Sequence, residues 1–140
     1  MRLTKVLPAI RFSRVSHGAQ AQAWEFDEPL TVAANSNGKT FHHLESAGRR
    51  NIAVSADTVA VSWEDDRDGT PRVYLARKHS DAKTFSSEIR ISGKGEAYEP
   101  SLLALDDDWF ALAWEENSRV HLRLVSPTEL GPVMVLGKDE

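Results

Sequence analysis

Large and small side chains alternate along several short stretches of the chain, in a pattern that predicts β-strands. Within residues 58–65, Val59, Val61 and Trp63 alternate with the small residues Ala60 and Ser62. A period of two residues is that of a strand, and alternation of large with small favours a strand covered on both faces by neighbouring sheets. No window of about 11 residues carries the spacing of an amphipathic helix. We therefore expect an all-β fold.

The same pattern returns later in the chain as an internal repeat. Trp114 follows Trp63 by 51 positions, and residues 109–116 repeat the alternation of residues 58–65. At the same offset, residues 52–54 align with residues 103–105 as first strands. Third strands are expected at 72–75 and 119–122, offset by 47 because the second loop is shorter, and fourth strands at 88–91 and 132–135.

An earlier half-unit precedes these two repeats. Residues 10–14 are expected to form a third strand and residues 26–32 a fourth. Four short strands in each repeat of roughly 40 to 50 residues are typical of β-propeller blades. We predict a single segment over residues 1–140, comprising about two and a half four-stranded blades of an incomplete ring: a half blade at about 9–34 and blades at about 49–92 and 99–136. A β-sandwich is the alternative.

Residues 61–69 form a tryptophan-acidic hairpin, and residues 73–77 and 83–88 follow it as a strand and a segment that leads into the fourth strand. This order resembles the succession of hairpin, strand, Asp box and fourth strand in the sialidase-like propellers with BNR, or Asp-box, repeats. The Asp box, Ser-x-Asp-x-Gly-x-Thr-Trp, falls on residues 78–85, where Thr84 and Phe85 fit while Lys78, Ser80 and Ala82 replace the Ser, Asp and Gly. The resemblance implies a propeller fold. The three arginines, the Tyr/Glu nucleophile pair and the acid/base Asp of catalytic sialidases have no counterparts that can be carried over.

Composition narrows the possible partners of the chain. A net charge of −4, a pI of about 5.7 and scattered basic residues give no footprint for nucleic acid or an anionic membrane. There is no cysteine, which excludes disulfides and thiolate metal sites. Pro8 and Arg11 interrupt the short apolar run near the start, so no signal peptide or membrane span is expected in the sequence as written, and the cellular compartment stays open.

Loops from one end of the predicted sheets provide the candidate ligand-binding residues. In a propeller the loops from strand four to the next strand one, and from strand two to strand three, emerge on the same face, which places residues 35–50, 64–71, 92–99 and 115–118 together. Long loops more often carry function than simple connections do. The candidates are His42, His43, Glu45, Arg49, Arg50, Glu64, Asp65, Arg67, Asp68, Tyr98 and Glu99.

Two of these segments contain residues that could bind a metal ion. His42 and His43 with Glu45 could ligate a metal, but adjacent histidines point apart in extended backbone and a solvated loop is favoured. The run from Asp66 to Gly69 resembles half of a calcium loop and lacks its downstream Glu, so a turn between strands is favoured. We expect no metal and no cofactor.

The carboxylates and aromatic residues have both structural and functional interpretations. Glu64-Asp65 and Glu115-Glu116 are paired carboxylates of the kind glycosidases use, but their repetition at equivalent positions favours carboxylates that belong to the repeat and are solvated or paired with Arg67 and Arg119. Arg49 and Arg50 could bind a carboxylate or sulfate bidentately. Trp63 and Trp114 are expected in the core, whereas Trp24 and Tyr98, placed outside the strands, are candidates for exposed aromatics.

These features together predict a non-catalytic recognition or scaffold module that binds a glycan or a protein through its loop face. The alternative is a fragment of an exo-sialidase-type glycoside hydrolase, although we expect no catalysis by this chain alone. A closed ring needs about four blades, so uncovered strand edges and apolar faces are expected to need self-association or further blades of a longer protein.

Overall fold

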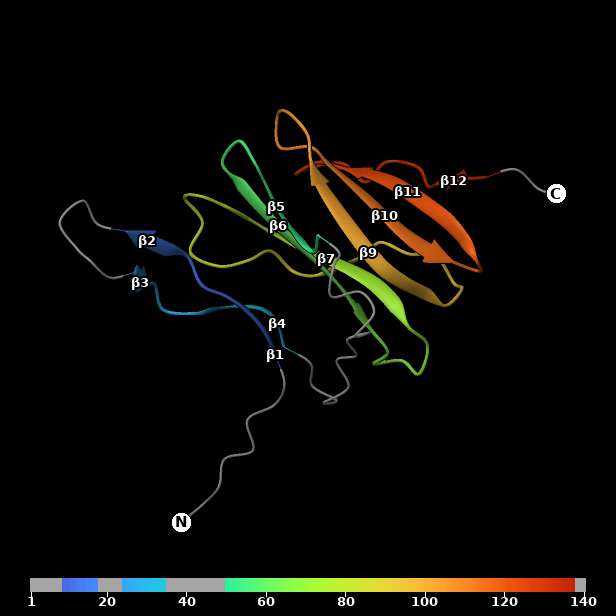
Figure 1. The fold of residues 1–140 in the computed structure, drawn as a ribbon, viewed down its shortest axis with the longest axis horizontal. Helices are drawn as coiled ribbons and strands as arrows, with labels where there is room; N and C mark the ends of the chain where they lie inside the picture. Colours follow the sequence, from blue (N-terminus) through green and yellow to red (C-terminus); the bar gives the residue numbers. More distant parts are fainter. Residues whose placement is uncertain (1–8, 18–23, 35–49, 138–140) are drawn as a thin grey trace, which may run out of the picture.

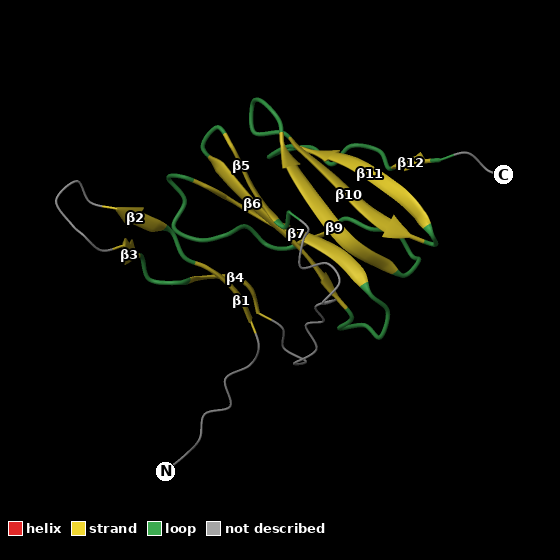
Figure 2. Cartoon of the chain, viewed as in Figure 1, coloured by secondary structure: helices red, strands yellow, loops and turns green. Residues whose placement is uncertain are grey.

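The computed structural model describes residues 9–17, 24–34 and 50–137, in which the regular elements are β-strands (Figure 1, Figure 2). The predicted all-β fold is confirmed for this part of the chain. None of the described residues forms a helix long and apolar enough to cross a membrane.

Two complete sheets follow each other along the chain, and each is an antiparallel meander of four strands. The first, the β5–β8 sheet, consists of β5 (Ile52–Ser55), β6 (Thr58–Asp65), β7 (Arg72–His79) and β8 (Ile89–Arg90). The second, the β9–β12 sheet, consists of β9 (Ala97–Ala104), β10 (Phe110–Glu116), β11 (Arg119–Val125) and β12 (Met134–Leu136). The order of the strands in each sheet is therefore the order predicted from the repeat.

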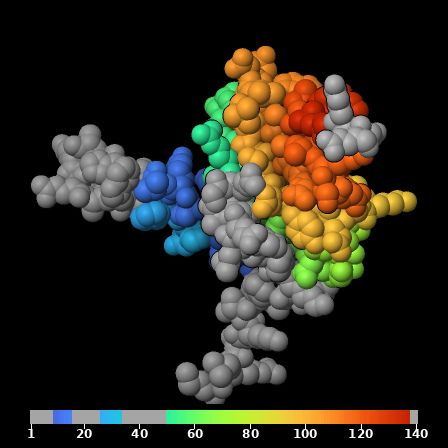
Figure 3. Space-filling model, turned by 45° about the vertical axis from the view of Figure 1, so that its right-hand side comes forward, coloured from blue at the N-terminus to red at the C-terminus, as the bar shows by residue number. Residues whose placement is uncertain are grey.

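The N-terminal strands form two shorter antiparallel pairs beside these sheets. β1 (Ala9–Phe12) pairs with β4 (Leu30–Ala34), and β2 (Val15–His17) pairs with β3 (Trp24–Phe26). The predicted single strand at 26–32 is wrong, since it is divided at Asp27–Pro29. Pro29 has no N–H for a ladder, and the Asp27 carboxylate instead binds the Arg14 guanidinium at 2.9 Å. The space-filling view shows the blue N-terminal strands beside the body formed by the two sheets (Figure 3).

Trp63 and Trp114 occupy equivalent positions in the two sheets. Trp63 lies opposite Tyr74 on the neighbouring strand, and Trp114 lies opposite His121 in the same register. Each indole is 2% exposed and stacks on its cross-strand partner, at 6.0 Å for Tyr74 and 5.6 Å for His121. Their predicted place in the core is confirmed. Trp24 and Tyr98 were predicted outside the strands, and this is wrong: they lie in β3 and β9.

The register of the first strands differs by one residue from the sequence alignment. Ile52 lies opposite Val61, whereas the residue opposite Leu112 is Leu102, so β9 is offset from β5 by 50 positions rather than 51. The cause is the turn between the first two strands. In the β5–β8 sheet this turn has two residues, Ala56 and Asp57. In the β9–β12 sheet it has three, residues 106–108, and is closed by a hydrogen bond from the Leu105 amide to the Trp109 carbonyl at 2.8 Å.

The two sheets pack face to face with opposite kinds of surface in contact. Large side chains project from one face of each sheet, and we call each set a bulky row. The bulky row of the β5–β8 sheet is Val59, Val61 and Trp63, and that of the β9–β12 sheet is Phe110, Leu112 and Trp114. The bulky row of the β9–β12 sheet packs on Ala60, Val73 and Leu75 of the β5–β8 sheet. The bulky row of the β5–β8 sheet packs on Val32 and Ala33 of β4 and on Phe12 of β1.

Two apolar areas of these sheets are left exposed within the described structure. Val54 lies opposite Val59, on the face of the bulky row, and is 65% exposed. On the outer face of the β9–β12 sheet, Leu103 lies opposite Ala111 and is 52% exposed. Val120 and Leu136, which are opposite each other in β11 and β12, are exposed on that same face. Exposed apolar surface of this kind is typical of interaction sites.

Candidate functional site

The candidate residues of the segments 64–71 and 92–99 gather where β6 and β10 end and β7 and β9 begin, which we call the loop end. The Glu99 amide donates to the Glu64 carboxylate at 2.9 Å, and the Ala97 amide donates to the Pro71 carbonyl at 3.0 Å. Arg72 donates to the Gly95 carbonyl. These bonds join the β6–β7 loop to the segment that enters β9. The prediction that residues 64–71 and 92–99 share one end of the sheets is therefore confirmed.

Asp65 and Arg67 form the centre of a charged cluster at this end. The Asp65 side chain is 1% exposed and accepts from the Arg67 backbone amide at 2.7 Å and from its Nε at 2.8 Å. Arg67 also binds the Glu88 carboxylate and lies over the Tyr74 ring, 4.6 Å from its centroid. The bond to Asp65, followed by that to Glu88, raises the pKa of Arg67. The cluster holds the β6–β7 loop against the strands.

Glu64 and Glu116 are buried carboxylates that bind backbone amides. Glu64 is 1% exposed and accepts from the Glu99 amide. Glu116 accepts from the Gly95 amide at 2.8 Å, the Gly93 amide at 3.0 Å and the Trp114 indole at 2.9 Å. Burial alone would raise the pKa of Glu116, but these three hydrogen bonds outweigh it and leave that pKa below its ordinary value. Each carboxylate thus ties a loop to the strand that carries it.

A shallow cavity of about 160 Å³ opens beside these loops on the outer face of the β9–β12 sheet. It is lined by Glu99, Ser101, Ala113, Trp114, Glu115 and Val120. Ligand pockets usually measure about 300 Å³ or more, so this cavity is large enough for one group of a ligand and not for a whole one. Tyr98, half-buried nearby, donates to Glu96 at 3.1 Å, and burial, followed by this bond, raises its pKa. The site offers carboxylate acceptors and an aromatic ring.

The remaining predicted residues are divided between the described and undescribed parts of the chain. His42, His43, Glu45 and Arg49 lie outside the described residues. Arg50 is exposed, and its carbonyl accepts from the Leu102 amide at 2.6 Å. Asp68 is exposed in the β6–β7 turn, where Gly69 has a φ of 79° and donates to the Asp66 carbonyl. The predicted turn at 66–69 is confirmed.

Sequence reasoning did not identify the partners of Glu116. Gly93 indicates this contact in retrospect, since a Cβ at Gly93 would lie 2.7 Å from the Glu116 Oε1 atom. Only a residue without a side chain lets the loop come this close to the carboxylate. Residues 9–17, 24–34 and 50–137 contain no group of three or more His, Asp or Glu side chains arranged to hold a metal ion.

Comparisons with known proteins give no identification. No protein-family model, curated protein or solved structure matches the chain.

Proposed function

We propose that the chain is a non-catalytic recognition or scaffold module built from sialidase-like propeller blades, which binds a glycan or a protein at the loop end. The main observation in support of the proposal is that the carboxylates at the loop end are buried and hydrogen-bonded within the protein. Glu64, Asp65 and Glu116 are buried and bonded to amides, an indole or an arginine. They build a fixed platform of loops, on which half-buried groups such as Tyr98 and Glu99 meet a ligand.

The arrangement of the two sheets supports propeller blades over a sandwich. Consecutive meanders with the same strand order are stacked so that the bulky row of the β9–β12 sheet lies on the opposite face of the β5–β8 sheet, which carries Ala60, Val73 and Leu75. A sandwich instead packs the inner faces of two sheets together and leaves their outer faces polar. Here the outer face of the β9–β12 sheet carries Leu103, Val120 and Leu136. We expect such a face to be covered by a further blade or a second chain.

The chemistry of the carboxylates supports binding over hydrolysis. A glycosidase needs two carboxyl groups facing the sugar, one protonated as acid and one ionised as base or nucleophile. Glu116 has a lowered pKa, which disfavours the protonated form that an acid catalyst requires. The hydrogen bonds of Asp65 and Glu64 point them at Arg67 and at the Glu99 amide.

Binding of the purified full chain to an array of neutral and sialylated glycans tests the proposal. We expect retention of a subset of glycans, weakened at least tenfold in Tyr98→Ala because aromatic stacking is lost. Phe26→Ala removes an exposed ring from β3 and is the matched control, which should bind like the unaltered chain.

A fluorogenic sialoside assay on the same preparations provides the opposing outcome. If the chain hydrolyses the sialoside and the Arg49→Ala and Arg50→Ala variants do not, the binding-module proposal is wrong and the exo-sialidase alternative is supported. Equal glycan binding by the Tyr98→Ala and unaltered chains would move the site away from the loop end. Light scattering checks the scaffold part: a monomer that unfolds cooperatively would contradict the need for neighbouring blades.

A further inference from the structure

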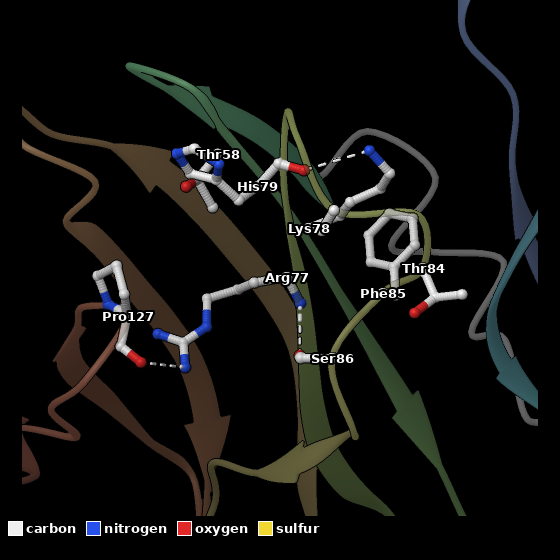
Figure 4. A pocket seen from close by; sticks show the side chains of 9 residues that line it. Thr58, Arg77, Lys78, His79, Thr84, Phe85, Ser86 and Pro127 are labelled. Carbon is white, nitrogen blue, oxygen red and sulfur yellow. Dashed lines mark hydrogen bonds between the residues drawn. The ribbon is translucent and has the colours of Figure 1, made fainter.

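A larger cavity lies at the end of the β5–β8 sheet opposite the loop end. Its volume is about 340 Å³, within the range of small-molecule pockets. It lies where β6 begins and β7 ends, next to the β11–β12 loop (Figure 4). The lining residues that matter here are Arg77, Lys78, Thr84, Phe85 and Pro127.

Arg77 brings an incompletely bonded cation to this cavity. Its side chain runs from β7 towards Pro127, and its Nη2 donates to the Pro127 carbonyl at 3.3 Å (Figure 4). Its Nη1 is buried and has no hydrogen-bond acceptor in the described part of the chain. The ion pairs among residues 9–17, 24–34 and 50–137 do not include Arg77. Burial lowers the pKa of Arg77. A guanidinium in this state favours binding of an anion.

The internal repeat shows that the fold does not need a cation at this position. Arg77 lies opposite Ala60, and the equivalent residue of the β9–β12 sheet, opposite Ala111, is Leu124. Arg123 is a useful contrast, since it is also partly buried. Its Nε donates to the Gly131 carbonyl and its Nη1 to the Ile91 carbonyl, so that it completes the fold.

The two other basic residues of the cavity already have partners. Lys78 donates to the His79 carbonyl at 3.2 Å, and His79 binds Asp81 at 2.5 Å. The bond to Asp81 is the main cause that raises the pKa of His79, with smaller contributions from Asp108 and Asp57. These carboxylates act on His79. Lys78, like Arg77, binds a backbone carbonyl and takes no part in the ion pairs of the described residues, so Arg77 and Lys78 are the two cations that a bound anion would meet.

We propose that this cavity binds a small organic carboxylate. The carboxylate accepts from the part of the Arg77 guanidinium that lines the cavity, and the apolar body of the ligand lies along Phe85 and Pro127, which line the same cavity. The volume exceeds what a bare oxyanion fills, so a ligand with a ring or a short aliphatic chain fits better than sulfate or acetate. The site is distinct from the loop end, and its test does not depend on glycan binding.

Benzoate and its neutral isostere benzamide test the proposal on the full chain. In ¹H–¹⁵N NMR titrations we expect benzoate to shift the amides of Arg77, Phe85 and Ser86, and benzamide to leave them unchanged. Arg77→Leu copies the residue of the second sheet and should weaken benzoate binding about tenfold or more, the effect of losing a charged hydrogen bond. Arg90→Ala removes an exposed cation from β8 and should bind like the unaltered chain.

Several outcomes would overturn the carboxylate site. These are equal responses to benzoate and benzamide, shifts confined to other parts of the sheets, or unchanged benzoate binding by Arg77→Leu. Should Arg77→Leu fail to fold, Arg77→Lys replaces it: retention of full benzoate affinity in that variant also counts against the site, because a lysine ammonium does not reproduce the planar, multidentate guanidinium. Acetate and sulfate, titrated alongside, should bind more weakly than benzoate.

Discussion

Replacement of Glu116 by glutamine tests how the loop end is held together. Glu116 accepts three hydrogen bonds, from the Gly93 amide, the Gly95 amide and the Trp114 indole, with donor–acceptor distances of 2.8 to 3.0 Å. The Glu116→Gln variant keeps the shape of the side chain, but it removes the charge and turns one acceptor oxygen into a donor that faces another N–H. Loss of a charged hydrogen bond costs about 2 kcal/mol. This corresponds to a fall in Tm of about 5 to 10 °C for a chain of this size.

The pH dependence of this effect has a definite sign. Because the folded-state pKa of Glu116 is lowered, the ionised carboxylate contributes stability in full above the pKa of the unfolded chain, about 4.3. That contribution is lost as the pH falls through the folded-state pKa. The difference in free energy of unfolding between the unaltered chain and Glu116→Gln should therefore be largest near neutral pH and should shrink below about pH 4.

Urea unfolding followed by tryptophan fluorescence at several pH values measures this difference. Glu115→Gln is the matched control, because Glu115 is the exposed neighbour of Glu116 on the same strand. It should change the free energy of unfolding by less than about 0.5 kcal/mol. Equal effects of the two variants, or a Glu116→Gln effect that does not vary with pH, would refute the reasoning.

Three further changes have expected outcomes that follow from described contacts. Gly93→Ala should destabilise the chain by about 1 to 2 kcal/mol, because its Cβ would lie 2.7 Å from the Glu116 Oε1 atom, and urea unfolding measures this. Arg67→Ala leaves the buried Asp65 carboxylate without its cation and should cost about 2 to 4 kcal/mol, seen as a lower midpoint in thermal unfolding, with part recovered by Arg67→Lys. Val54→Thr should reduce binding of a hydrophobic dye and leave the unfolding midpoint almost unchanged, since Val54 is exposed; a large loss of stability would show that the residue is covered.

The strands could be predicted from the sequence because their side chains repeat. The alternation around Trp63 and Trp114 identified β6 and β10, and the two indoles are equivalent in register and burial. The alignment of β5 with β9 failed by one residue, because the lengths of the turns at Ala56 and at 106–108 depend on backbone geometry. Within residues 9–17, 24–34 and 50–137, six residues other than glycine have positive φ, Ala56 among them, and the identity of alanine does not reveal that conformation.

The candidate site was less accessible to sequence reasoning. Chain topology placed Glu64, Asp65 and Tyr98 at one end of the sheets, and the structure agrees. The roles of the side chains at the loop end depend on contacts between residues far apart in sequence, such as the hydrogen bonds of Glu116 with the Gly93 and Gly95 amides. Arg77 was not singled out at all. Leu124 is the equivalent residue in the second repeat, and the difference between the two residues could have pointed to Arg77. This equivalence is evident only when the registers of β7 and β11 are known.

Each sheet packs its bulky row on the opposite face of the element before it, and this gives the stack of sheets a polarity. Each sheet therefore has two different faces, one with the bulky row and one that receives it. Two copies that met through identical faces would bring two bulky rows together, or two of the opposite faces. A two-fold symmetric dimer through these faces is therefore disfavoured. Growth by the same contact is head-to-tail, and such assemblies either close into rings or extend as filaments. The angle between successive sheets decides between these outcomes.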